Sequence, residues 1–418
     1  MSDTASAHRA AERAARHSYG KLVAWLAART RDVAAAEDAL SDAFAAALAT
    51  WPVQGIPRAP EAWLLSAARR RMIDVARRRR TSERAADHLL LSIEEVAAEA
   101  GDTGGVPDQR LRLLFACAHP AIDPAMRSPL MLQTVLGLEA ATIAAVFLVP
   151  PATMGQRLVR AKRRIRDAGI PFRLPEREDL PARLDAVLEA IYAAFSAGWA
   201  DSAGLDQRRQ GLVDEALWLG RLLADLMPDE PEVLGLLALM LHAAARSAAR
   251  RDSDGGYVRL SMQDPVRWDA AAIAEAEAVL LRASALKRIG RFQLEAAVQS
   301  VHAARRRTGC TDWPAIVELY DGLLTLTGSP IVAVNRAVAL GETDGAAAGL
   351  AALDGLSADP GLAGYQPYWA ARADLLARLG ADADADAAYA QALGLEADQA
   401  ARRFLEARRS ELRLLSRG

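Results

Sequence analysis

Apolar residues recur every three or four positions along most of the chain, which is the spacing of amphipathic helices. Between residues 32 and 50, Val33, Ala36, Leu40 and Phe44 share one side of such a helix. Alternating runs of Val, Ile, Thr and Tyr, which a strand needs, are hard to find. Aromatic residues make up only 5% of the chain, while Ala and Leu dominate, as suits packed helices. The pattern predicts an all-α protein.

The opposite side of the 32–50 helix is acidic. Asp38 and Asp42 lie there one turn apart, and such a pair of like charges is mildly destabilising in an isolated helix. A basic protein partner would explain why both charges are left unneutralised. A solvated acidic face is the commoner explanation, and the sequence leaves both open.

A second amphipathic helix is predicted from Glu61 to Arg80. Its buried stripe consists of four apolar side chains, Leu64, Ala68, Met72 and Val75. Its other side carries charged side chains, Arg70, Asp74 and Arg77, and the helix ends in a run of four arginines. Such a surface suits nucleic-acid phosphates. Trp51 and Trp63, near a Pro-rich loop expected over residues 51–60, could stack on unpaired bases, although buried packing is the commoner role of tryptophan.

The clearest candidate chemistry lies between residues 142 and 166. A short helix over 142–147, a turn with two prolines and a helix from Ala152 together predict a helix-turn-helix. The apolar stripe of the second helix is Met154, Leu158, Ala161 and Ile165. Its polar side carries Gln156, Arg160 and Arg163, with Thr153 and Arg157 at the edges. Arg reads guanine and Gln reads adenine in the major groove, whereas Lys162, Arg164 and Arg166 would reach phosphates. A solvated basic helix face is the alternative.

The chain divides by composition into three helical units with two connections. We expect units at 5–81, 108–170 and 183–418, joined by a Gly-rich linker over 82–107 and a Pro-rich segment over 171–182. The stretch 370–393 has the small–aromatic–small pattern of a tetratricopeptide-like hairpin. A generic Ala-rich helical bundle is the alternative for the third unit.

Charge separates the front of the chain from the rest. Residues 1–172 contain 24 Lys and Arg against 18 Asp and Glu, and the remainder contains 27 against 35. A basic front suits nucleic acid and an acidic back suits protein contacts. By itself, this difference suggests that the third unit folds back on the basic surfaces and inhibits them.

Candidate enzyme and metal chemistry is weak. Cys117 and Cys310 are far apart and form no metal spacing, which favours a reducing cytoplasm. Cys117 and His119 lack a third group for a triad and are interpreted as packed residues. The histidines, His242 and His302 among them, are scattered. We expect no signal peptide, membrane span, metal, cofactor or enzymatic activity. The apolar stretch 233–245 is interpreted as a buried helix.

Three of these segments together resemble the sigma-70 family, specifically the extracytoplasmic-function (ECF) RNA polymerase sigma factors. The segment 36–44 looks like region 2.2, the segment 60–74 like regions 2.3 and 2.4, and the segment 149–162 like the recognition helix of region 4.2. They occur in the family's order and spacing. The resemblance implies a region 2 bundle and a region 4 helix-turn-helix.

The resemblance also implies which residues bind which partner. Core RNA polymerase would be bound through its β′ clamp helices and β flap, with region 2.2 contributing Asp38, Ser41 and Asp42. The −10 element of promoter DNA would be contacted by Trp63, Arg70, Arg71, Asp74, Arg77 and Arg78. The −35 element would be contacted by Thr153, Gln156, Arg157, Arg160, Lys162, Arg163 and Arg164. Gly155 lies inside the recognition helix, where glycine lowers helix stability by roughly 1 kcal/mol compared with alanine.

The third unit is similar to one subgroup of these factors. The matching stretches are 183–192, 228–240, 311–313 and 335–339. That subgroup carries a tetratricopeptide-like extension that is thought to regulate activity, and small YCII-related proteins are associated with it. A stand-alone helix-turn-helix regulator with a helical sensor domain is the alternative function. It leaves the acidic helix and the second basic helix without a role.

Overall fold

The computed structural model describes residues 2–78, 109–147, 149–176, 178–200, 211–396 and 398–415. These residues form α-helices and short 3-10 helices, and their one isolated β-bridge joins Arg251 to Tyr257. The all-α prediction is confirmed. The linker expected over residues 82–107 lies outside the described residues. The chain forms two compact units, residues 1–219 and 220–418, and each is described by itself.

The first unit begins with three long helices, α1 (Ser2–Thr30), α2 (Val33–Gln54) and α3 (Pro60–Arg78), which pack on one another. Asp32 caps α2, because its carboxylate accepts a hydrogen bond from the backbone N–H of Ala35 at 3.0 Å. The helix runs through Trp51 and ends at Gly55, which has a positive φ of 86°. The loop expected over residues 51–60 is therefore shorter than predicted, since its first four residues continue α2.

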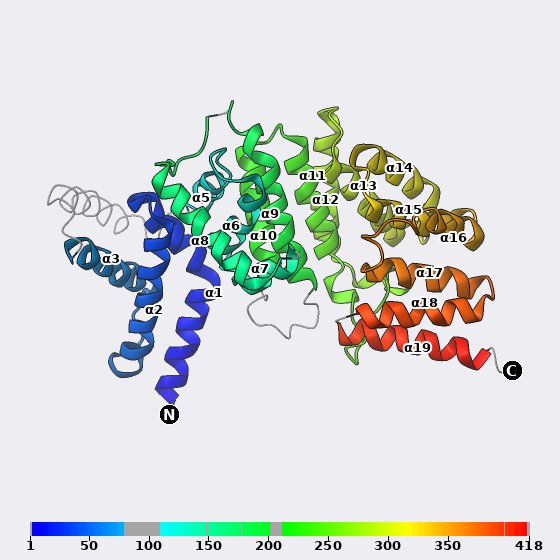
Figure 1. The fold of residues 1–418 in the computed structure, drawn as a ribbon, viewed down its shortest axis with the longest axis horizontal. Helices are drawn as coiled ribbons and strands as arrows, with labels where there is room; N and C mark the ends of the chain where they lie inside the picture. The colour runs from blue at the N-terminus through cyan, green and yellow to red at the C-terminus, as the bar shows by residue number, and fades with distance from the viewer. Residues whose placement is uncertain are drawn as a thin grey trace. The chain divides into compact units, whose positions relative to one another are not determined.

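The rest of the first unit is a second group of helices packed against this bundle (Figure 1). It contains α5 (Arg110–Cys117), α6 (Pro124–Thr134), α7 (Ala140–Val146), α8 (Pro151–Asp167) and α9 (Pro181–Ala200), and α10 (Leu212–Leu226) begins in it. The approach is closest at Gly20 of α1, where an added Cβ would lie 1.7 Å from the carbonyl oxygen of Val135. Only glycine fits between these two backbones.

The third predicted unit does not begin where the second compact unit begins. Arg183 on α9 donates a hydrogen bond to the carbonyl oxygen of Phe115 at 3.3 Å, and Ser128 donates one to the carbonyl oxygen of Ala186 at 3.2 Å. Arg110 also forms an ion pair with Glu215. These contacts place residues 183–219 with the first unit, so the boundary expected at residue 183 lies inside it.

The second unit is a succession of helices in which neighbours along the chain pack on each other. Its helices are α11 (Pro231–Ala244), α12 (Ala270–Ala285), α13 (Arg291–Thr308), α14 (Trp313–Thr327), α15 (Pro330–Thr343), α16 (Ala346–Asp354), α17 (Gln366–Arg378), α18 (Asp382–Leu395) and α19 (Gln399–Leu415). In Figure 1, α17, α18 and α19 stack side by side. Such packing is common to helical-repeat proteins, and the tetratricopeptide-like assignment stays a prediction.

The apolar stretch interpreted as a buried helix corresponds to α11. Residues 231–249 have the length and hydropathy of a membrane span, but 67% of the most apolar window is buried inside the protein. The buried set includes Val233, Leu236 and Met240. Gly235 lets α13 approach closely, since an added Cβ would lie 2.6 Å from the backbone nitrogen of Gln293. This stretch is therefore a core helix of the second unit.

Candidate nucleic-acid interface

Helix α8 presents a cationic side to solvent, as its sequence predicted. The buried residues of α8 are Met154, Leu158, Ala161 and Ile165, which are the four residues of the predicted stripe. The exposed residues include Gln156, Arg157, Arg160 and Arg163, and Thr153 is half-buried. Helix α7 precedes α8 and packs on it, which gives the helix-turn-helix its two arms. Nothing in the described chain lies within 4 Å of a Cβ added at Gly155, so the α8 backbone is open there.

Lys162 does not lie on this exposed side. Its ammonium group forms an ion pair with the carboxylate of Glu37 on α2, at 2.6 Å between Nζ and Oε2. The side chains of Lys162 and Glu37 are only 12% and 11% exposed. Burial raises the pKa of Glu37, and the charge of Lys162 opposes that rise. Lys162 was predicted to contact phosphate, but in this structure it is occupied by a buried carboxylate.

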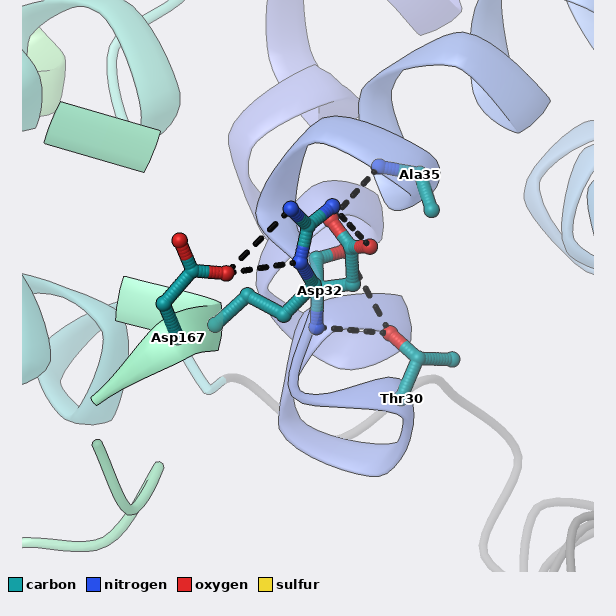
Figure 2. Close-up of polar contacts among 5 residues, drawn as sticks. Thr30, Asp32, Ala35 and Asp167 are labelled. Atoms are coloured by element: carbon teal, nitrogen blue, oxygen red, sulfur yellow. Dashed lines mark hydrogen bonds and ion pairs between the residues drawn. The ribbon is translucent and has the colours of Figure 1, made fainter. Parts of the chain in front are cut away.

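A second contact between the same two helices involves Arg166. Its guanidinium lies 3.5 Å from Asp32 and 3.3 Å from Asp167 (Figure 2). Asp32 is thus both the cap of α2 and an ion-pair partner of α8. The charge of Asp32 is the main cause that raises the pKa of Arg166. Arg164 donates a hydrogen bond from Nε to the carbonyl oxygen of Ala121 at 3.3 Å, so it too is engaged within the first unit.

The acidic side of α2 differs from the prediction in one respect. Asp38, Ser41 and Asp42 are all exposed, as expected. Asp42, however, accepts a hydrogen bond from Nε of Arg71 on α3 at 2.6 Å. The expectation of two unneutralised charges was therefore wrong, because packing of α3 on α2 brings a cation to one of them.

The residues predicted to contact the −10 element lie on and near α3. Asp74 and Arg70 are exposed, and Arg70 donates to the carbonyl oxygen of Ser66 at 3.3 Å. Trp63 is half-buried and meets Trp51 edge to face, with ring centroids 5.5 Å apart. Trp51 is 2% exposed, so it is a packed residue and has no free face for stacking. The side chains of Arg77 and Arg78 lie outside what the structure describes.

Sequence reasoning missed Glu37 and Asp32 as partners of α8. Glu37 carried a usable signal, because it follows Val33 by four residues and precedes Leu40 by three, which places a carboxylate on the apolar face. A buried carboxylate needs a partner, but nothing in the pattern identified Lys162, which lies 125 residues away.

The candidate thiol chemistry has a packing explanation. Cys117 is buried, and its Sγ lies 3.5 Å from the hydroxyl oxygen of Thr134. Burial raises the pKa of this thiol to about 12. His119 accepts a hydrogen bond from the backbone N–H of Ala121 at 3.1 Å. The described residues contain no group of three or more His, Cys, Asp or Glu side chains placed to hold a metal ion.

Comparisons with known proteins identify the domain that α1, α2 and α3 form. Residues 15–82 match the sigma-70 region 2 family, and residues 183–284 match a family of unknown function, DUF6596. Uncharacterized protein R00370 of Rhizobium meliloti (strain 1021) is 39% identical over 369 residues, which cover 87% of each chain. No solved structure matches. The chain therefore contains a sigma-70 region 2 domain, which is a domain of RNA polymerase sigma factors that act in transcription initiation, and over most of its length it belongs to the same family as R00370.

Proposed function

We propose that the chain is an ECF-type sigma factor that binds core RNA polymerase and directs promoter-specific initiation. The observation that carries the proposal is the exposed cationic side of α8, with Gln156, Arg160 and Arg163, beside a sigma-70 region 2 bundle. Arginine and glutamine side chains on a recognition helix read guanine and adenine edges in the major groove. On this proposal α8 reads the −35 element.

The polymerase-binding surface is proposed on α2. Asp38 and Ser41 are exposed there, next to Asp42, and the β′ clamp helices are the proposed partner, with the β flap as the partner of region 4. Because Asp42 already pairs with Arg71, Asp38 is the acidic group that a basic partner meets first. Docking at Asp42 would release Arg71 for the −10 element. Among the residues that the structure describes, Trp63, Arg70 and Asp74 are the other proposed contacts to that element.

Simultaneous promoter contacts require α2 and α8 to separate. The −10 and −35 elements are centred about 25 base pairs apart, which is roughly 85 Å of B-form DNA at about 3.4 Å per base pair. The Lys162–Glu37 pair instead joins the two helices directly, with 2.6 Å between Nζ and Oε2. A linker over 82–107 extends to roughly 90 Å at most, so the chain is long enough. Separation would also free Lys162 and Arg166 for the phosphate contacts predicted for them.

Run-off transcription with purified core polymerase over a pool of genomic fragments tests the proposal. We expect specific transcripts only when polymerase and the full chain are both present, and weak binding of the chain alone to the same promoters. R160A/R163A should reduce transcription by at least tenfold, since each base contact contributes about 1–3 kcal/mol. R282A, at an exposed arginine of α12, is the matched control. Tight promoter binding without polymerase would instead identify a stand-alone regulator.

Charge reversal at Asp38 tests the polymerase surface separately. D38R should weaken capture of core polymerase by the full chain, because it places a cation opposite a basic partner. D344R, at an exposed aspartate of the second unit, should leave capture unchanged. Equal capture by D38R and D344R would exclude this face of α2.

We further propose that the acidic C-terminal part of the chain modulates this activity in the cytoplasm. The charge difference between residues 1–172 and the remainder supports this assignment. The resemblance offers a small YCII-related protein as a candidate partner. Mixing such a protein with the full chain in the run-off assay tests it, and an unchanged transcript yield would exclude the partner.

A further inference from the structure

Basic side chains gather at one place in the second unit, where the end of α11 packs on α13. His242 lies on α11, and Arg246 follows one turn later, just past the helix end. Gln299 and His302 lie one turn apart on α13. Nη2 of Arg246 donates a hydrogen bond to Oε1 of Gln299 at 2.5 Å. This bond joins the end of α11 to α13.

His242 is buried without the hydrogen bonds that its ring requires. Its side chain is 1% exposed, and neither ring nitrogen has a hydrogen-bond partner among the described residues. Nε2 of His242 lies 3.5 Å from a carboxylate oxygen of Glu277 without forming a hydrogen bond to it, and the same oxygen accepts one from Ser300 at 2.6 Å. Buried polar atoms are rarely left unsatisfied. The unpartnered nitrogens therefore point to a group that is not part of the chain.

The electrostatic environment of Arg246 is strongly cationic. The pKa of Arg246 is lowered to about 10, first by burial and then by the charges of Arg250 and Arg305. The pKa values of His242 and His302 are both lowered to about 4, by burial and then by the charge of Arg246. Both rings are therefore neutral at pH 7 and can each donate one N–H.

Two carboxylates lie near these cations, and both have contacts of their own. Asp398 forms its ion pair with Arg251 at 2.8 Å, although its charge also reaches Arg250. Glu277 lies beside His242. Arg246 itself donates its hydrogen bond to the uncharged amide of Gln299.

Arg246 also differs from the arginines that hold the neighbouring loop together. Arg305 donates to the carbonyl oxygens of Leu260, Ser261 and Gln263 at 2.7–3.1 Å, with its guanidinium 5.0 Å from the ring centroid of Trp268. Arg267 likewise donates to the carbonyl oxygens of Ala248 and Arg251. These two fix the loop over 251–268. Arg246 makes no such carbonyl contact within the described residues, and its side chain is half-buried.

We propose that Arg246, with His242 and His302 beside it and Arg250 nearby, forms a binding site for a small oxyanion that carries a phosphate or carboxylate group. A guanidinium offers two parallel N–H donors that match two oxygens of such a group. The ligand would place a negative charge beside Arg246 and supply acceptors for the imidazole N–H groups. The site lies within the second unit and does not depend on the sigma-factor function.

Calorimetric titration of the full chain with inorganic phosphate, and separately with acetate, tests the proposal at constant ionic strength. We expect saturable binding of at least one of the two anions, and the stronger binder identifies the ligand chemistry. R246Q should weaken that binding at least tenfold, whereas R306Q, at an exposed arginine on α13, should not change it. No saturable binding of either anion, or equal binding by R246Q, would overturn the proposal.

Two further measurements keep the test decisive. If R246Q fails the circular-dichroism check for folding, R246K replaces it. This variant keeps the charge but loses the two-pronged donor, so its binding should also weaken, and unchanged binding would reject the site. Histidine NMR should show the pKa values of His242 and His302 rising from about 4 on anion binding, because a neighbouring negative charge favours the protonated ring. Unchanged histidine titrations would place the anion elsewhere.

Discussion

The ion pair between Glu37 and Lys162 should stabilise the first unit far more than the exposed pair between Asp42 and Arg71. Both pairs have the same 2.6 Å separation between nitrogen and oxygen. They differ in burial, since the first pair is 12% and 11% exposed and the second 45% and 53%. Comparing them isolates the effect of the surrounding medium on the strength of an ion pair.

The expected magnitudes follow from this difference in exposure. At an effective dielectric constant of about 20, two unit charges 2.6 Å apart attract by roughly 6 kcal/mol. Removing each charge from water costs several kcal/mol, so the net coupling is much smaller. We expect a coupling energy of about 3 kcal/mol for Glu37 and Lys162. For Asp42 and Arg71, screening by water leaves about 0.5 kcal/mol.

Two double-mutant cycles on the full chain measure these energies. One cycle uses E37Q, K162Q and the double variant, and the other uses D42N, R71Q and their double variant. Because the chain has two compact units, global unfolding would mix their transitions. Hydrogen exchange of peptides from α2 and α8, followed at increasing urea, reports the first unit alone.

Equal coupling energies in the two cycles would refute the reasoning, because they would show that burial does not decide the strength of these pairs. A coupling energy below about 1 kcal/mol for Glu37 and Lys162 would place that pair in the range of exposed ion pairs. The α2–α8 contact would then be held by apolar packing instead.

Three other outcomes are expected. G20A should destabilise the first unit by about 3 kcal/mol, because the new Cβ would lie 1.7 Å from the carbonyl oxygen of Val135. G155A should stabilise α8 by about 1 kcal/mol, because its new Cβ meets nothing within 4 Å. Hydrogen exchange distinguishes the two variants, and equal effects would contradict the close approach of α1 to Val135. Iodoacetamide should modify Cys310, which is exposed, and leave Cys117 unmodified until denaturant is added. K162Q should raise the pKa of Glu37 further above its ordinary value, because the charge of Lys162 opposes the rise caused by burial. Stability from a raised carboxyl pKa is lost as pH rises through that pKa, so K162Q should regain stability as the pH falls through it, and E37Q/K162Q should not.

Local periodicity predicted much of the structure of α8. The stripe of Met154, Leu158, Ala161 and Ile165 is buried because a helix places residues three and four apart on one face, whatever else surrounds it. The same rule placed Gln156, Arg160 and Arg163 in solvent. It failed for Lys162, which is next to Ala161 in the stripe and whose long side chain reaches a carboxylate on another helix.

The hydrophobic pattern could not predict contacts between segments that are far apart in the sequence. Arg71 neutralises Asp42 only because α3 packs on α2 in one register. His242 and His302, sixty positions apart in the sequence, both lie close enough to Arg246 for its charge to lower their pKa values. In each case the contact depends on a distance between two helices that tertiary packing fixes. The spacing of residues within a single helix does not determine that distance.

The buried pair has a consequence for polymerase binding if the sigma-factor proposal holds. Separation of α2 from α8 breaks the contact between Lys162 and Glu37, and a cost of about 3 kcal/mol from this pair alone leaves at most about one chain in 150 open. Any partner that requires the open form then binds at least about 150-fold more weakly than its contacts alone would allow. Polymerase and promoter together can supply that energy, because each of the two modules gains its own contacts when they part. Neither partner needs to contact Glu37 for this coupling between polymerase and promoter binding, because both bind the open form and therefore shift the same equilibrium away from the closed form.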